Sequence, residues 1–167
     1  MGIFNNLFGK KEEKTIEAVA DNAVLAVCDG EFIPAEKIAD PVFAENMMGQ
    51  TVAIEPTNST ITSPVNGTLE VVFPTGHAFA VRANDGTGYL VHIGIDTVSM
   101  NGEGFKALKK QGDTVKAGET VVEVDFNKVE AANHPKTTMI IITEPVEDKT
   151  YSYIDFGTVK ANQIISK

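Results

Sequence analysis

Only one cysteine, Cys28, occurs among the 167 residues, so no disulfide can form within the chain. Cys28 follows the apolar residues 23–27, and because a free cysteine packs like a small hydrophobic side chain, we expect it to be buried. Long hydrophobic runs are also lacking, since none approaches the ~20 residues that are needed to cross a bilayer. No signal peptide with a small-residue cleavage site is present either. These absences predict a soluble, cytoplasmic protein.

Basic side chains are scarce relative to acidic ones. The chain has 14 Lys and Arg against 23 Asp and Glu, which gives a formal net charge of −9. Proteins bind the phosphate backbone of nucleic acids through Lys and Arg that release counterions, and no basic or aromatic strip occurs here. We therefore expect no nucleic-acid partner, whereas a basic protein would suit this charge.

The first 14 residues differ from the rest and are interpreted as an N-terminal arm, followed by one domain over residues 15–167. Within the arm, apolar side chains fall on one face of a short helix, and three lysines follow them. Such a pattern suits a membrane surface. An arm this short could equally pack on its own domain or stay loose, so the pattern alone does not decide between these roles.

Short apolar or alternating runs, separated by turn sequences, dominate the domain. Many short strands with frequent turns favour an all-β fold, an antiparallel β-sandwich or barrel with a few short helices. Helices are expected at residues 105–111, before Gly112, and at 127–133, before Pro135. The expected strands are 23–28, 51–55, 68–73, 79–83, 89–95, 120–125, 138–142 and one near 163–166.

His92 lies within one of these expected strands. Alternate side chains of a strand point to opposite faces. If Val91 and Ile93 face the core, then Leu90 and His92 face outward together, with the side-chain-free Gly94 next on that side. His92 would then be open to approach from outside.

His77 stands at the entry to the preceding strand, directly after a Pro-Thr-Gly turn. Strands 79–83 and 89–95 are joined by a turn at 84–88, so they are expected to form a hairpin. Antiparallel pairing would bring the start of the first strand beside the end of the second, and His77 beside His92. Two neighbouring imidazoles can bind a metal, perform acid–base chemistry or carry a group covalently. The third histidine, His134, precedes a proline and is interpreted as an incidental surface residue.

The two histidine segments, Gly-His-Ala-Phe at 76–79 and Val-His-Ile-Gly-Ile-Asp-Thr-Val at 91–98, carry a specific resemblance. Together with six other segments, they resemble the glucose-type enzyme IIA of the phosphoenolpyruvate-dependent sugar phosphotransferase system. The likeness covers nearly all of the chain after the arm. The other matching segments are residues 30–31, 40–45, 52–57, 63–68, 102–105 and 112–118.

This resemblance implies an antiparallel β-sandwich and a role for each matching residue. His92 would accept the phosphoryl group as a tele-phosphohistidine, His77 would stabilise that group by hydrogen bonding, and Thr75 would orient His77. Docking of partners is implied for residues at the rim of the site and in its apolar surround. These are Asp40, Val42, Phe43, Phe73, Phe79, Leu90, Asp96 and Val98.

The resemblance also implies the partners and the cofactor requirement. The phosphoryl donor would be the phosphocarrier protein HPr, and the acceptor would be a cysteine on the IIB domain of a glucose-family permease. Other proteins could be regulated according to the phosphorylation state. No cofactor is required, although zinc could be held by His77, His92 and a carboxylate of a partner. The chain departs from the family at Gly76, where Asn is common, and at Leu90 and Ile93, where Phe is common.

Three alternatives come from other classes of protein. A zinc hydrolase of the lysostaphin-like type needs three protein ligands, but Leu90 and Gly94 stand where its second histidine would be, and Val81 stands where its acidic ligand would be. A biotin- or lipoyl-carrier module needs a lysine at an exposed hairpin tip, and residues 84–88 contain none. A purely regulatory binding protein is harder to separate by sequence.

Overall fold

The computed structural model describes residues 17–167, and the arm predicted at residues 1–14 lies outside them. Within the described residues the chain forms eleven strands in two antiparallel sheets, with only short helices. The predicted all-β fold is therefore confirmed. No helix in this part of the chain is long and apolar enough to span a bilayer.

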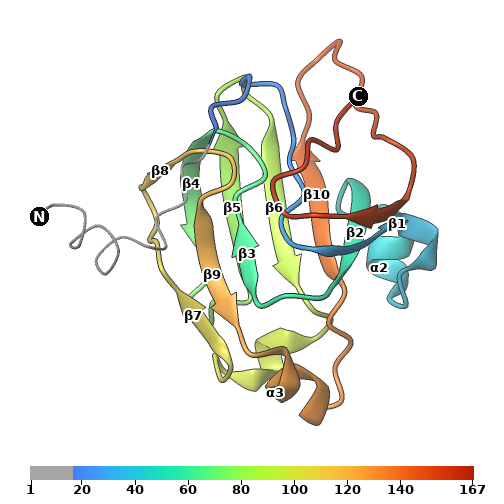
Figure 1. Ribbon diagram of the computed structural model, residues 1–167, viewed down its shortest axis with the longest axis vertical. Helices are drawn as coiled ribbons and strands as arrows, with labels where there is room; N and C mark the ends of the chain where they lie inside the picture. The colour runs from blue at the N-terminus through green and yellow to red at the C-terminus, as the bar shows by residue number, and fades with distance from the viewer. Residues whose placement is uncertain (1–16) are drawn as a thin grey trace, which may run out of the picture.

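The larger sheet has eight strands and the smaller one has three (Figure 1). Neighbours in each sheet pair in antiparallel register. In spatial order, the larger sheet contains β11 (Gly157–Val159), β1 (Gly30–Pro34), β2 (Gln50–Pro56), β10 (Thr138–Glu144), β6 (Gly88–Ile93), β5 (Ala78–Ala83), β4 (Gly67–Val72) and β8 (Thr114–Val115). The smaller sheet contains β3 (Thr60–Thr62), β9 (Thr120–Val124) and β7 (Phe105–Ala107).

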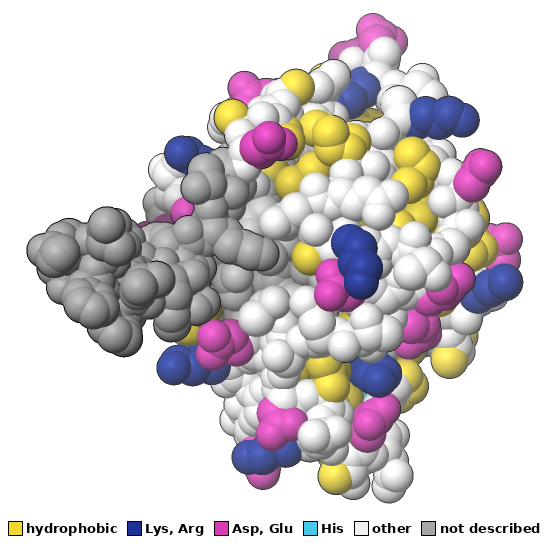
Figure 2. All heavy atoms as spheres, in the orientation of Figure 1, with side chains coloured by type: hydrophobic (Ala, Val, Ile, Leu, Met, Phe, Trp, Pro, Cys, Tyr) yellow, Lys and Arg dark blue, Asp and Glu magenta, His cyan; other side chains and the backbone are white. Residues whose placement is uncertain are grey.

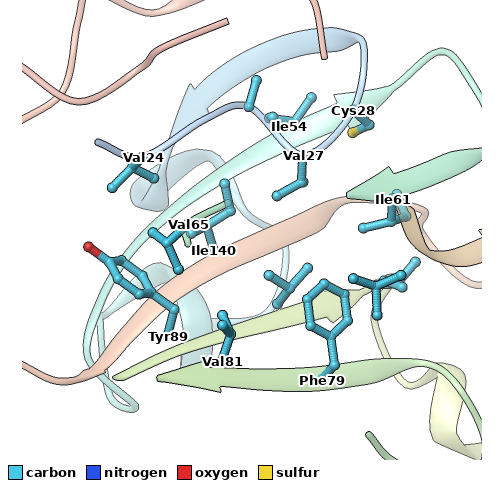
Figure 3. Close-up of a cluster of buried hydrophobic side chains, with 14 of the residues drawn as sticks. Val24, Val27, Cys28, Ile54, Ile61, Val65, Phe79, Val81, Tyr89 and Ile140 are labelled. Carbon is cyan, nitrogen blue, oxygen red and sulfur yellow. The ribbon is translucent and has the colours of Figure 1, made fainter. Parts of the chain in front are cut away.

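The main hydrophobic core lies between the two sheets. It combines side chains of the larger sheet, such as Val81 and Ile140, with side chains of the smaller one, such as Ile61 and Val122. Figure 3 shows Phe79 and Val81 pointing from β5 into this cluster. Cys28 is also fully buried in it, as predicted. Burial and the nearby Asp29 carboxylate raise the pKa of the Cys28 thiol to about 12.

A second, smaller core covers the opposite face of the larger sheet. Strand β6 shows the alternation directly, because Val91 and Ile93 belong to the main core, whereas Leu90 belongs to the second one. Phe43 closes the second core from the short helix α2 (Pro41–Ala44). Asp40 caps this helix by accepting a hydrogen bond from the backbone N–H of Val42 at 2.8 Å, and proline at the first helical position suits a helix start.

The expected strands agree with the structure except at the two ends of the domain. Residues 23–28 and the C-terminal segment form no strand pair, and one isolated bridge, Leu25 with Ile164, joins them beside a few backbone hydrogen bonds. Their backbone groups bond to several separate segments instead of one neighbouring strand. The expected helix at 127–133 is confirmed as α3 (Phe126–Ala131). The short elements β1, β3, β7, β8, β11, α2, η1 (Ala35–Lys37) and η2 (Thr97–Met100) were not expected.

The helix expected at residues 105–111 is wrong. This segment begins as strand β7, in which Phe105 pairs with Val124 and Ala107 pairs with Val122. The backbone N–H of Leu108 continues the contact by donating to the carbonyl of Val121 at 2.8 Å. Pairing with the smaller sheet therefore outweighs the local helical pattern.

The docking role implied for Phe79 also needs correction. Its side chain has an exposed fraction of 0% and lies within the main core. A side chain without accessible surface cannot contact a partner, so Phe79 contributes to the fold instead.

We predict that Phe79→Ala lowers the free energy of unfolding by about 3–5 kcal/mol, because it removes a large buried ring and leaves a cavity. Leu108→Ala is the control, since Leu108 is 44% exposed and substitutions at such surface positions usually change stability by no more than about 0.5 kcal/mol. Urea denaturation measures both. Equal stability of the two variants would contradict the buried position of Phe79.

Candidate functional site

The hairpin of β5 and β6 brings His77 and His92 together, as the sequence predicts. Ala78 lies opposite His92 in the register, and the backbone N–H of Ile93 donates to the carbonyl of His77 at 2.8 Å. The centroids of the two imidazole rings are 5.2 Å apart, and the ring planes are nearly perpendicular at 81°. One small tetrahedral anion could therefore contact both rings.

A backbone carbonyl orients His92. The Nδ1 atom of its ring lies 2.8 Å from the carbonyl oxygen of Gly94. Because a carbonyl oxygen only accepts hydrogen bonds, Nδ1 must carry the proton. In the neutral ring this leaves the lone pair on Nε2. Gly94 is in turn held by its own N–H, which donates to the carbonyl of Thr137 at 2.9 Å.

His77 is oriented by a hydroxyl group. The Oγ1 atom of Thr75 lies 2.5 Å from Nδ1 of His77, as the role expected for Thr75 requires. Both residues belong to the tight turn between β4 and β5, where Gly76 has a left-handed φ of +75°. A Cβ atom at Gly76 would lie only 3.0 Å from Cβ of Phe105. Glycine at this position therefore suits both the turn and its contact with β7.

Both rings are neutral near pH 7. Burial lowers the pKa of His77 to about 4, and the proximity of His92 adds to that effect. Burial also lowers the pKa of His92, against the opposing effects of the Gly94 carbonyl and the carboxylates of Asp40 and Asp96. A neutral imidazole keeps the lone pair that a nucleophile needs.

Apolar rings pack directly against the two imidazoles. The ring of Phe43 lies 5.2 Å from that of His92, and the ring of Phe73 lies 5.2 Å from that of His77, both measured between centroids. Phe43 and Leu90 are buried in the second core. Val42, Phe73 and Val98 are exposed at 39%, 37% and 55%. Of these three, Phe73 contacts the pair directly, through the ring of His77.

Two carboxylates lie close enough to influence His92. Asp40 is half-buried at the start of α2, and Asp96 is exposed with a left-handed φ of 62° just before η2. The visible part of the face in Figure 2 shows scattered charges of both signs and no imidazole. The histidine pair therefore does not open onto that part of the surface.

His134 is not part of this pair. It is half-buried, and its Nε2 lies 3.3 Å from the hydroxyl of Ser99 in η2. Within residues 17–167, no group of three or more His, Cys, Asp or Glu side chains is arranged to hold a metal ion.

Sequence reasoning missed the contribution of the backbone to the site. Gly94 was noted only because it lacks a side chain, whereas its carbonyl selects the tautomer of His92. A glycine two residues after a strand-borne histidine is a signal for such a contact, since the chain turns there and exposes its carbonyl groups.

Comparison with known proteins gives a consistent result. A family model described as phosphoenolpyruvate-dependent sugar phosphotransferase system, EIIA 1, matches residues 22–148. The glucose-specific EIIA component of Oceanobacillus iheyensis is 41% identical over 165 residues, which cover 98% of each chain. That of Haemophilus influenzae is 38% identical over 143 residues, which cover 86% of this chain and 84% of the relative.

Two further relatives extend the comparison. A glucose-specific EIICBA component of Streptococcus pneumoniae is 38% identical over 144 residues, which cover 86% of this chain and 20% of that much longer protein. The solved structure of glucose permease IIA from Mycoplasma capricolum superposes with a TM-score of 0.81 at 38% identity, covering 86% of this chain and 93% of the other. The match of the family model over residues 22–148, the similar relatives and the similar solved structure show that the chain belongs to the EIIA 1 family of the phosphoenolpyruvate-dependent sugar phosphotransferase system.

Proposed function

We propose that this phosphotransferase-system component carries a phosphoryl group on Nε2 of His92, receiving it from phospho-HPr and passing it to a cysteine of a sugar-specific IIB domain. The observation that carries the proposal is the bond between Nδ1 of His92 and the Gly94 carbonyl. This bond leaves the lone pair on Nε2 of His92, and the ring of His77 lies next to the ring that carries it.

In the first step, the Nε2 lone pair forms a bond to phosphorus while the bond between phosphorus and the donor atom of HPr breaks. The electron pair of the broken bond stays with the donor. The His92 ring now carries a positive charge, because Nδ1 keeps its proton. The Gly94 carbonyl and the carboxylates of Asp40 and Asp96 favour that charge, as their effects on the pKa of His92 indicate.

His77 stabilises the transferred group without bonding to it covalently. If the Thr75 hydroxyl donates to Nδ1 of His77, then Nε2 carries the proton and can donate to a phosphoryl oxygen. Phosphoryl transfer passes through a loose transition state, so positioning and charge stabilisation account for most of the catalysis. A hydrogen bond to a charged group of this kind contributes about 1.5–3 kcal/mol.

In the second step, the sulfur of the acceptor cysteine, as thiolate, attacks phosphorus while the Nε2–P bond breaks. The electron pair returns to Nε2, and His92 becomes neutral again. The relative named EIICBA supports a IIB-type acceptor. Cys28 of this chain is unsuited to that role, because its thiol is fully buried and its pKa is raised to about 12.

The surface around the pair suits brief docking of partners. Val42, Phe73 and Val98 offer apolar contact and exclude water from a hydrolysable phosphohistidine. Asp40 and Asp96 favour a basic partner. Because each partner must be released, the interface should be small, below roughly 1,200 Å² in total.

Zinc binding and regulation of other proteins stay predictions. The two imidazoles supply two nitrogen ligands, one fewer than a catalytic zinc site takes from protein. A carboxylate from a bound partner would be needed to complete such a site. The pair alone fits zinc only in that shared form.

We predict that His92→Ala abolishes labelling. With enzyme I, HPr and phosphoenolpyruvate, the wild-type protein should gain one acid-labile, alkali-stable phosphoryl group, and the variant should gain none because Nε2 is absent. His134→Ala is the control and should label normally, since His134 contacts Ser99 instead of the pair. Labelling of His92→Ala would show that another residue is the acceptor.

We predict that His77→Gln still accepts the phosphoryl group but passes it to the IIB domain at least about tenfold more slowly, the effect of losing about 1.4 kcal/mol of stabilisation. Glutamine keeps an N–H donor, but Thr75 no longer fixes a ring, so the donor is not held at the phosphoryl oxygen. Sugar phosphorylation in a reconstituted system measures the rate. A wild-type rate would remove His77 from the mechanism.

The lowered pKa values predict the effect of pH. An NMR titration of the ring protons should give His77 a pKa of about 4, and the phosphorylation rate should be flat from pH 8 to 7. Because the unfolded chain takes up these protons first, near pH 6.5, the stability from both histidines is present above that pH. It should decline progressively as the pH falls toward 4. A His77 that is half-protonated near pH 6.5 would contradict this.

A further inference from the structure

We propose that Thr97 is a positioning residue for phosphoryl transfer. Its side chain fixes the turn after β6, so that the Gly94 carbonyl holds the proton of His92 on Nδ1. The catalytic part of this inference rests on the proposed role of His92, whereas the structural part concerns the unphosphorylated protein alone.

The hydroxyl of Thr97 bonds to the last residue of β6. Its Oγ1 donates to the carbonyl oxygen of Ile93 at 2.6 Å, and the Thr97 side chain has an exposed fraction of 0%. The N–H of the same Ile93 still pairs across the hairpin with the carbonyl of His77. The Thr97 hydroxyl therefore provides a hydrogen bond to the backbone at the point where the ladder between β5 and β6 ends. Without its hydroxyl, the Ile93 carbonyl would lose a short, buried hydrogen bond.

The methyl group of Thr97 packs against Gly94. A Cβ atom added to Gly94 would lie 2.5 Å from Cγ2 of Thr97, so the α-carbon and the methyl group are in close contact. The turn between them is tight, with left-handed φ values of +78° at Gly94 and 62° at Asp96. The hydroxyl thus fixes the carbonyl end of the peptide group that joins Ile93 to Gly94, whereas the methyl group only packs beside the other end.

The orientation of Gly94 decides which nitrogen of His92 is available. Its carbonyl accepts from Nδ1 at 2.8 Å, and its N–H donates to the carbonyl of Thr137 at 2.9 Å. If the turn relaxed, the carbonyl would move away from Nδ1, and the proton could shift to Nε2. A protonated Nε2 has no lone pair and cannot accept a phosphoryl group.

The test removes the hydroxyl group and the methyl group of Thr97 in separate variants. Thr97→Val keeps the shape and loses the hydroxyl, whereas Thr97→Ser keeps the hydroxyl and loses the methyl group. The matched control is Thr62→Val, which removes another buried threonine bond, from Oγ1 to the Val27 carbonyl at 3.2 Å, in the smaller sheet. Thr97→Ala also removes the hydroxyl and serves if the valine variant does not fold.

Two measurements are made on each variant. Ring ¹⁵N NMR of the unphosphorylated protein reports the tautomer of His92, and initial labelling from phospho-HPr reports the rate. We expect Thr97→Val and Thr97→Ala to gain Nε2–H tautomer and to label about tenfold more slowly, the effect of about 1.4 kcal/mol on the barrier. Thr97→Ser and Thr62→Val should keep the Nδ1–H tautomer and label within about threefold of the wild-type rate.

Thr97→Val or Thr97→Ala with an unchanged tautomer would overturn the proposal, whatever happens to stability or rate. A tautomer shift in Thr62→Val would overturn it as well, because general loosening would then suffice. If the wild-type protein itself is not labelled, the proposed function fails instead, and the tautomer measurement still decides whether Thr97 positions the ring.

Discussion

The antiparallel pairing of β5 with β6 is the constraint on which the site depends. The register places Ala78 opposite His92, so His77 stands at the open end of the ladder, directly beside the second imidazole. The same register sends Val91 and Ile93 into the main core. A shift by one residue would bury His92 and expose its neighbours, so the packing of the sandwich and the geometry of the histidine pair are fixed by one set of bonds.

The site balances two opposing demands on charge. In the unphosphorylated protein, burial against Phe43 and Phe73 favours neutral imidazoles. After the proposed transfer, the His92 ring and its phosphoryl group would carry opposite charges side by side. The carbonyl of Gly94 and the carboxylates of Asp40 and Asp96 then favour the positive ring. In the unphosphorylated protein burial outweighs these effects, so the pKa of His92 remains lowered.

Much of this arrangement could be predicted from the sequence, because it depends on local pairing. The turn at residues 84–88 and the two flanking strands place His77 beside His92, and alternation along β6 separates Val91 from His92. The remaining features of the fold depend on contacts between segments that are far apart in the sequence. Within the segment 105–111, residues 105–107 form a strand because β9 lies beside them. Phe79 shares its face of β5 with Val81, and it is fully buried because the smaller sheet covers that face. The alternation within β5 gives the face, but it does not show what covers it.

The family resemblance supplied the residue roles, but it did not distinguish surface from support. Phe43 and Leu90 are buried in the second core, whereas Val42, Phe73 and Val98 reach solvent. For Val42 and Phe43 this division follows from α2, an element of four residues that is too short to appear as a periodic pattern in the sequence.

Asp40 contributes both to the fold and to the charge of the site. One of its oxygens caps α2 at the N–H of Val42, and its negative charge favours the cationic form of His92. An asparagine would preserve the cap and lose the charge, and an alanine would lose both. A single carboxylate thus ties the folding of α2 to the electrostatics around His92, so a substitution of Asp40 must meet two separate requirements to be neutral.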